Sequence, residues 1–340
     1  MMRDTTLDFG LAEGESYEPV EFDDALDLSK PHVMTALGPI DPGQLGFTLH
    51  HEHLICKPLD VGTGDPDLML DDPAAALAEL EDAAQLGLGG IVDMTPVDYG
   101  RDVIDIRWVA QRSPVHIVLA TGHHKHKHAA RYLGDEPIEV IAGRSTSEIR
   151  DGIEGTDARA GVIKAGTSLN EITAVERRVL QAAAMAQLAT GAPISTHTER
   201  GTMALEQITT LHEAGADLSK VVIGHMDFAL DEPYLRSVLE HGVYVSFDQV
   251  SKTKYASDED RAAMLKRLAG AGRLNQLLVS GDLARKSYYL AHGGGPGFRY
   301  LVERFPLVMM DAGLTAQQVR AICVDNPARA LTIVPPGAPG

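Results

Sequence analysis

Residues 46–53 read Gly-Phe-Thr-Leu-His-His-Glu-His, a short apolar run that leads directly into a group of histidines. Seven more apolar runs of similar length follow along the chain. Each run is too short for a helix and is rich in β-branched residues, which is typical of strands buried on both faces of a sheet. The sequence therefore predicts eight strands, at residues 46–49, 91–94, 115–120, 161–163, 193–196, 221–224, 243–247 and 277–280.

Helix start and stop signals lie between these runs. Asp72 with Pro73 is expected to begin a helix that stops near Gly87. Four more helix starts are predicted, at Asn170 (residues 171–190, ended by Gly191), Asp231 with Pro233 (ended by Gly242), Ser257 with Asp260, and Thr315 with Gln318. Repeated strand–helix alternation predicts a (β/α)8 TIM barrel. A doubly wound open sheet is the alternative, but no glycine-rich phosphate turn follows the first run.

Composition limits the classes of partner. The 340 residues carry 30 Lys and Arg against 48 Asp and Glu, a net charge of −18, which argues against nucleic acid and against an acidic membrane surface. The chain contains only two cysteines, Cys56 and Cys323, so we expect a reduced, cytoplasmic setting without a disulfide framework. Residues 1–32 are predicted to form an acidic extension, residues 33–334 the barrel domain, and residues 335–340 a flexible tail. A homodimer is the expected assembly, because homodimers are the commonest oligomers.

The first candidate metal ligands are His51 and His53. Residues two apart in a strand point the same way, so both imidazoles can reach one metal ion, while His50 and Glu52 are expected to face the other side in a structural role. Taken alone, such a pair is more often two ordinary polar histidines than a ligand pair.

Further chemical groups follow other predicted strands. His197, His225 and Asp282 each come directly after one, and Lys164 ends another. Because the carboxyl ends of barrel strands meet at one mouth, these side chains are expected to lie together despite their separation in sequence. A lysine among cations has a lowered pKa, and its neutral amine can add carbon dioxide to give a carbamate that bridges two metals. The alternative is a plain lysine that pairs with an acid.

Several motifs together resemble the phosphotriesterase family of the amidohydrolase superfamily, over residues 33–332. They are residues 46–54 (GFTLHHEHL), 91–102 (IVDMTPVDYGRD), 161–164, 195–198, 224–227, 280–282 and 325–328. The resemblance implies that His51, His53 and Asp282 bind the more buried of two divalent metals, zinc first, with cobalt or manganese as alternatives. It implies that His197 and His225 bind the more exposed metal and that carboxylated Lys164 bridges the two. This chain has His50 at a position where many members of the family have a smaller polar residue.

The resemblance also implies a mechanism. A hydroxide shared by two metals attacks the substrate, and Asp282 transfers its proton to the leaving group, with Lys164 as the other catalytic residue. No serine or cysteine nucleophile is required. The leading hypothesis is hydrolysis of a lactone. Phosphotriester or amide hydrolysis by the same metal core is the second hypothesis, and a non-catalytic barrel that binds a small molecule is the third.

The loops that follow strands determine the substrate in this fold. The segments 252–255, 282–289 and 293–297 look like the sugar-lactone branch of the family, some members of which act on phosphorylated lactones. Lys254, Arg285 and Tyr288 are expected to bind a phosphate or a carboxylate of the substrate. One helical turn is expected to present Asp282, Arg285 and Tyr288 toward the pocket. Tyr99 is a further predicted substrate contact. The alternative is that Lys254 and Arg285 are solvated loop charges. Residues 123–128 (HHKHKH) read as an exposed loop, in which His124 or Lys125 can line the entrance to the pocket.

Overall fold

The computed structural model describes residues 27–58 and 64–337. Most of the predicted acidic extension, and the end of the predicted tail, lie outside these ranges. No helix in the described part of the chain is both long enough and apolar enough to cross a membrane.

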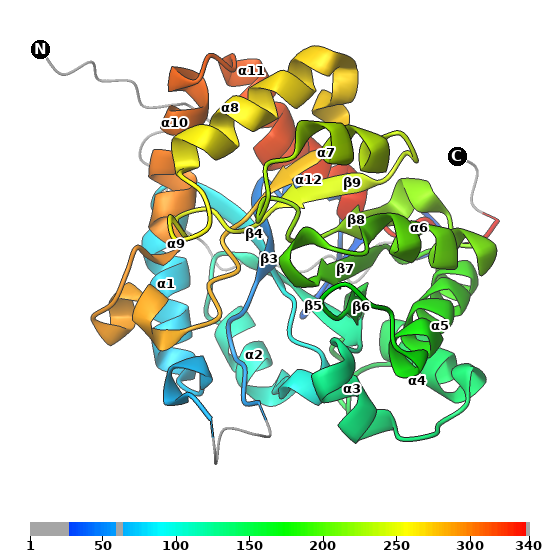
Figure 1. Cartoon of the computed structure of the whole chain (residues 1–340). Coiled ribbons are helices and arrows are strands. Elements are labelled where there is room, and N and C mark those ends of the chain that lie inside the picture. Colours follow the sequence, from blue (N-terminus) through cyan, green and yellow to red (C-terminus); the bar gives the residue numbers. More distant parts are fainter. Residues whose placement is uncertain (1–26, 59–63, 338–340) are drawn as a thin grey trace, which may run out of the picture.

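Eight parallel strands form the centre of the molecule (Figure 1). They pair in chain order, each with its sequence neighbour, and all eight predicted strands are confirmed. The last strand returns to the first, because the backbone amide of Asp282 donates to the carbonyl of His51 over 3.1 Å. The chain therefore folds as a (β/α)8 TIM barrel. The strands are β3 (Phe47–Glu52), β4 (Leu88–Asp93), β5 (His116–Gly122), β6 (Ala160–Thr167), β7 (Ile194–Thr198), β8 (Val221–Ile223), β9 (Tyr244–Phe247) and β10 (Leu277–Val279).

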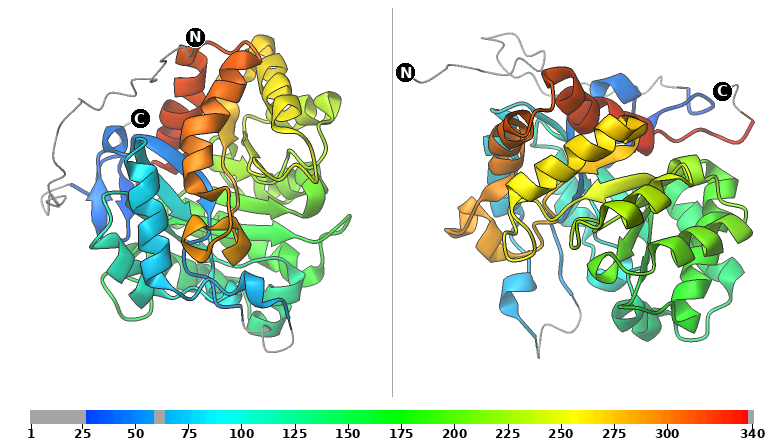
Figure 2. Two further views of the ribbon diagram at one scale, coloured as in Figure 1. Left: turned by 90° about the vertical axis from the view of Figure 1, so that its left-hand side faces the viewer. Right: turned by 45° about the horizontal axis from the view of Figure 1, so that its top comes forward.

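Helices surround the strands, and the C-terminal helices pack beside α8 (Figure 2). Asp72, Asp231, Ser257 and Thr315 each accept a backbone hydrogen bond at a helix start, so these four predicted caps are confirmed. The helices are α1 (Pro73–Ala84), α2 (Val103–Ala110), α3 (His126–Leu133), α4 (Ile138–Arg150), α5 (Ala174–Thr190), α6 (Ala204–Glu213), α7 (Glu232–Leu239), α8 (Asp258–Leu268), α9 (Gly297–Arg299), α10 (Phe305–Asp311), α11 (Ala316–Arg320) and α12 (Asn326–Leu331).

The predicted start of α5 at Asn170 is wrong. The helix begins after Thr173, whose side chain accepts from the amide of Glu176 while the Glu176 carboxylate accepts from the amide of Thr173. Asn170 instead has φ +60° and lies in a turn, a conformation that asparagine tolerates better than most residues. The reciprocal pair of hydrogen bonds between Thr173 and Glu176 fixes the start of the helix three residues later than predicted.

The core divides into two parts by strand alternation. Side chains that point outward from the strands pack beneath the helices in one large cluster. Those that point inward form smaller clusters inside the barrel, one of which includes Val92, Val118 and Val162. A hairpin of β1 (Val33–Thr35) and β2 (Gly38–Ile40) packs Val33 and Ile40 against this cluster. Lys164 lies two residues after Val162, so the same alternation directs it inward at the carboxyl end.

Candidate metal centre

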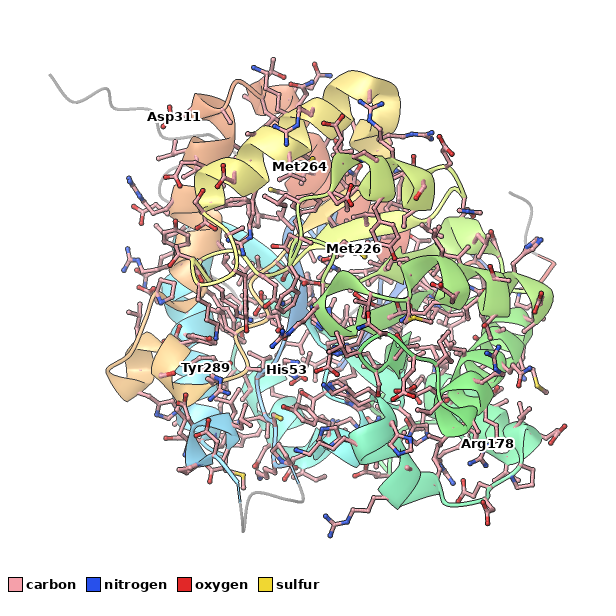
Figure 3. The ribbon with its side chains drawn as sticks, in the orientation of Figure 1. His53, Arg178, Met226, Met264, Tyr289 and Asp311 are labelled. Atoms are coloured by element: carbon pink, nitrogen blue, oxygen red, sulfur yellow. The ribbon has the colours of Figure 1, made fainter. Side chains whose placement is uncertain are left out.

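The six predicted ligands meet at the carboxyl end of the barrel. His51 lies on β3 and His53 directly follows it, while Lys164 lies on β6 and His197 on β7. His225 lies two residues after the end of β8, and Asp282 lies three residues after the end of β10. Strand β6 continues to Thr167, so Lys164 is inside the strand and does not end it as predicted. His53 lies near the centre of the molecule in Figure 3, and the Tyr289 hydroxyl donates to its carbonyl oxygen.

Three of these residues form a group that can hold a metal ion. The ligand atoms of His51, His53 and Asp282 all lie within 4.8 Å of one another. His53 Nε2 is 3.4 Å from Asp282 Oδ1, and Thr95 fixes the ring by a 2.7 Å hydrogen bond to its other nitrogen, Nδ1. A divalent ion of the zinc type prefers this set of imidazole and carboxylate donors.

His197 and His225 lie on the other side of His51. The centroid of the His225 ring is 4.7 Å from that of His51 and 4.5 Å from that of His197. His197 Nε2 is buried and has no hydrogen-bond partner among the described residues. A buried nitrogen without a partner costs free energy, and a metal ion at that nitrogen would remove the cost. The residues present therefore fit a second cation on this side.

Lys164 lies beside His51, whose ring neighbours those of both His53 and His225. Its side chain is almost fully buried, and Nζ is 3.1 Å from His51 Nε2. Burial lowers the pKa of Lys164 to about 8, although the carboxylates of Asp282, Asp248 and Asp98 oppose the shift. An amine with this pKa is partly neutral at physiological pH, which is the form that reacts with carbon dioxide. Its position and chemistry both fit a bridging carbamate.

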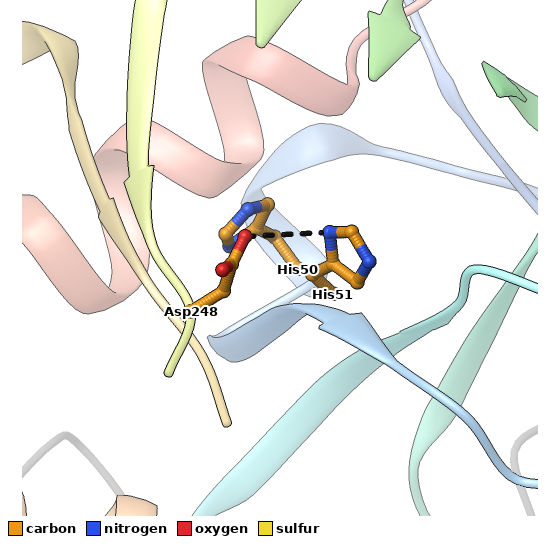
Figure 4. Close-up of side chains that lie close together, drawn as sticks. All are labelled: His50, His51 and Asp248. Atoms are coloured by element: carbon orange, nitrogen blue, oxygen red, sulfur yellow. Dashed lines mark ion pairs between the residues drawn. The ribbon is translucent and has the colours of Figure 1, made fainter. Parts of the chain in front are cut away.

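Sequence reasoning missed Asp248, which follows β9 and contacts a ligand from each side. Its Oδ1 accepts from His225 Nδ1 over 2.7 Å, and its Oδ2 is 3.4 Å from His51 Nδ1. The close-up in Figure 4 shows the Asp248 carboxylate beside His51 and His50. Burial alone would raise the pKa of Asp248, but His225 and then His51 hold it well below its ordinary value. The only sequence signal was an aspartate directly after a predicted strand, as at Asp282.

The prediction that His50 faces away from His51 is wrong. Both imidazoles reach Asp248, with ligand atoms of all three residues within 4.8 Å. The register between β3 and β4 shifts between Leu49 and Glu52, so strict alternation does not hold across the histidines. Glu52 has the expected structural role: its carboxylate accepts from the Ser280 hydroxyl over 2.6 Å and from the backbone amides of Gly281 and Leu283. Glu52 thereby fixes the loop that carries Asp282.

A second residue that sequence reasoning missed is Lys252, which holds Asp282 directly. Its buried ammonium donates to Asp282 Oδ2 over 3.0 Å, to the Asp282 carbonyl over 2.6 Å and to Gln249 Oε1 over 3.1 Å. Burial alone would raise the pKa of Asp282, but Lys252 and then His53 hold it well below its ordinary value. The sequence shows two lysines in this loop, Lys252 and Lys254, and their spacing does not reveal which one points inward.

The predicted phosphate-binding residues are only partly assembled. Lys254 Nζ lies 3.4 Å from the Tyr288 hydroxyl, so these two residues do meet. Arg285 instead contacts two carboxylates of a preceding loop, Asp65 and, over 3.3 Å, Asp67. The predicted helical turn from Asp282 to Tyr288 is wrong, because Arg285 has extended backbone angles and the short 3-10 helix begins only at Lys286.

Tyr99 and His124 lie at the mouth beside the candidate ligands. The centroid of the Tyr99 ring is 5.8 Å from that of His53, and the centroid of the His124 ring is 4.7 Å from that of His197. The prediction of an exposed loop over residues 123–128 is wrong at its start, since His123 and His124 are buried. Burial lowers the pKa of His124 well below its ordinary value, and the nearby cations lower it further. Lys125 pairs with Glu199 over 2.6 Å, and His126 begins α3.

A TIM barrel with imidazoles, a lysine and an aspartate gathered at the carboxyl ends of its strands is the scaffold of a metal-dependent hydrolase. The chain belongs to the phosphotriesterase family, whose model matches residues 31–331.

Three relatives illustrate the range of similarity. A lactonase from Listeria monocytogenes is 38% identical and superimposes with a TM-score of 0.83, over 89% of this chain and 99% of its own. The phosphotriesterase homology protein from Escherichia coli, solved with phosphate in its active site, is 34% identical with a TM-score of 0.81, over 85% of this chain and 99% of its own. A phospho-furanose lactonase from Mycoplasmopsis synoviae is 31% identical, over 89% of this chain and 92% of its own.

Proposed function

We propose that this protein hydrolyses a lactone, of the phosphorylated sugar class, at a centre of two divalent metal ions. The observation that carries the dinuclear site is the presence of two neighbouring groups of ligands beside a buried lysine. His51, His53 and Asp282 form one group, and His197 and His225 form the other. Carboxylated Lys164 is the proposed bridge, with zinc as the first choice of metal and cobalt or manganese as alternatives.

The ions supply a water nucleophile at neutral pH and polarisation of the scissile carbonyl. The chain's own residues move the proton. Asp282 Oδ2 accepts the proton released as water adds to the carbonyl, and returns it to the ring oxygen as the lactone opens. Gln249 Nε2 and Lys252 Nζ hold Oδ2 over 3.1 and 3.0 Å, which keeps Asp282 oriented for both transfers.

The mouth also carries the groups that would select the substrate. Lys254 and Tyr288 meet at one side of it, and Arg285 lies three residues after Asp282. A planar guanidinium, an ammonium and a phenol together suit a phosphate monoester. Arg285 reaches such a group by exchanging Asp65 and Asp67 for the phosphate oxygens. The name of the relative from Listeria supports a lactone substrate, and the name of the relative from Mycoplasmopsis supports a phosphorylated one.

The test is a pH-indicator screen of the metal-loaded enzyme on lactones with and without a 5-phosphate, on phosphotriesters and on amides. We expect the phosphorylated sugar lactones to have the highest kcat/KM. Preferred turnover of a phosphotriester or an amide would replace the lactone proposal, and turnover of none with two metals bound would indicate a binding protein.

A matched pair of substrates tests the phosphate-binding residues. Replacement Arg285→Met should lower kcat/KM for a 5-phosphorylated lactone by about 10- to 150-fold, because a charge-assisted contact is lost. The unphosphorylated lactone should be unaffected. Arg304→Met serves as the control, because Arg304 is exposed and lies at the end of a different helical segment, Tyr300–Arg304. Equal losses of kcat/KM on both substrates would indicate that Arg285 stabilises the fold and does not bind the phosphate.

A further inference from the structure

Six aromatic or imidazole side chains form a closed ring around the mouth of the barrel. Each ring lies beside the next, with centroids 4.5 to 6.1 Å apart. Four members are candidate metal ligands, and the other two are Tyr99 and His124. In order around the mouth, the members are His53, Tyr99, His124, His197, His225 and His51.

The backbone around His124 is fixed from two sides. Its amide donates to both oxygens of the buried Asp98 carboxylate, over 3.1 and 3.0 Å. Gly122, two residues earlier, has φ +86°, and a Cβ there would lie 2.1 Å from the Lys164 carbonyl oxygen. Only glycine allows β5 to end so close to Lys164 and then turn toward the mouth. The location of His124 therefore depends on the close approach of β5 to Lys164 on the neighbouring strand β6.

The imidazole of His124 is also fixed in its tautomer. Its Nδ1 accepts from the backbone amide of Lys125 over 2.7 Å, so Nδ1 carries no proton and the ring proton lies on Nε2. Among the described residues, none forms a hydrogen bond with Nε2. The neutral ring thus offers one donor, on the side of the ring opposite the backbone contact.

We propose that His124 is a substrate-contacting residue whose Nε2–H donates a hydrogen bond to an oxygen of the bound lactone and of its ring-opened product. The inference rests on the proposed function for the identity of the substrate, but it adds a residue beyond the metal ligands and the phosphate-binding side chains. His124 is not placed among the ligands, because binding a cation through Nε2 would move the ring proton to Nδ1, where the amide of Lys125 already donates. A preorganised donor beside His197 lowers the cost of orienting the substrate.

Two substitutions distinguish the roles of the two nitrogens of His124. In His124→Asn the amide oxygen can still accept from Lys125, but the outer donor is lost. In His124→Gln the amide nitrogen can reach the position of Nε2. We expect kcat/KM on the preferred lactone to fall about 3- to 10-fold in the Asn variant, as one neutral hydrogen bond predicts, and to stay within about twofold in the Gln variant. His126→Asn, in the same histidine run but at the exposed start of α3, is the control and should behave as wild type.

Two further measurements do not depend on turnover. Metal content by elemental analysis should be the same in all four proteins. Calorimetry with 4-hydroxybutyrate, the ring-opened product of the simplest five-membered lactone, should show weaker binding to the Asn variant by the same factor as in kcat/KM. Any of three results would overturn the proposal. The first is loss of metal from His124→Asn, and the second is unchanged binding of 4-hydroxybutyrate to that variant. The third is no binding of 4-hydroxybutyrate to wild type. Failure of wild type to open any lactone would instead reject the proposed function, and the calorimetry would still decide the role of His124.

Discussion

The mouth of the barrel has two parts that are built in different ways. We call the mostly buried residues His51, Lys164, Asp248 and Asp282 its floor, and the loop residues Lys254 and Arg285 its rim. On the floor, the side chains of Asp248, Asp282 and Lys164 are each held by short contacts to residues from other strands and loops. On the rim, Lys254 and Arg285 are partly exposed and pair within the loops, Arg285 with Asp65 and Asp67. Residues held in this way determine the reaction type, because rearranging buried polar groups costs free energy. A rim of this kind selects among substrates, because its contacts can be exchanged.

The largest effect should follow loss of a ligand from the floor. Replacement His51→Asn should remove metal and lower kcat more than about 10³-fold, because stabilisation of transition-state charge by the ions is lost. Elemental analysis and steady-state kinetics on the same sample check this. The control is His32→Asn. His32 is also buried, but its backbone pairs with Ile333 near the C-terminal end of the described chain. Full activity of His51→Asn would contradict the assignment.

Buried charge in the barrel wall should matter for stability. The Arg101 guanidinium bonds Glu148 through two nitrogens, over 2.9 and 2.8 Å. Burial alone would raise the pKa of Glu148, but Arg101 holds it below its ordinary value. Because the pKa is lower in the folded state, the pair stabilises the fold above the unfolded pKa of about 4.3, and this contribution is lost as pH falls through the folded pKa.

Replacement Glu148→Gln should therefore lower the free energy of unfolding by about 3–5 kcal/mol at pH 7, with a smaller difference from wild type below pH ~4. Denaturant unfolding at several pH values measures it. Asp157→Asn, which removes the partner of an exposed pair with Arg107, should change stability little. A difference from wild type that does not shrink in acid would mean that the ionised carboxylate is not the stabilising form.

A smaller effect is expected for Asp248, which contacts ligands without being one in the proposed site. Asp248→Asn should weaken metal binding about 10- to 100-fold, because the carboxylate orients an imidazole on each side of the centre. Competition with a chelator should show weaker retention of both ions. Loss of only one ion would show that the 3.4 Å approach to His51 has no role, and unchanged affinity for both would contradict the orienting function.

The smallest effect should come from the rim. Removing a carboxylate that competes for Arg285, in Asp67→Asn, should raise kcat/KM for a phosphorylated lactone by about 2- to 5-fold, since exposed ion pairs are weak. Asp71→Asn, which frees Lys286 instead, is the matched control. A decrease for Asp67→Asn would indicate that Asp67 holds the loop in its active position through Ser287.

The same contrast explains what could be predicted from the sequence. The strands and the grouping of Lys164, His197 and Asp282 were predictable, because apolar runs reveal strands and parallel strands bring their ends together. Asp248 and Lys252 could not be singled out, since their roles depend on which side chain faces inward after a strand ends. His50 was misplaced because a register shift inside β3 is invisible in the sequence. Arg285 was misjudged because its partners, Asp65 and Asp67, lie about 220 residues earlier.

The proposed dinuclear centre is tested most directly by adding metal back to the chelated enzyme in measured steps. Zinc content and lactone hydrolysis are determined on the same samples, for wild type and for Lys164→Ala. We predict that wild type binds two ions per chain and that activity rises with the second equivalent, whereas Lys164→Ala retains fewer ions and little activity. Full activity of wild type with a single ion, or two ions and full activity in Lys164→Ala, would contradict a lysine-bridged pair of metals.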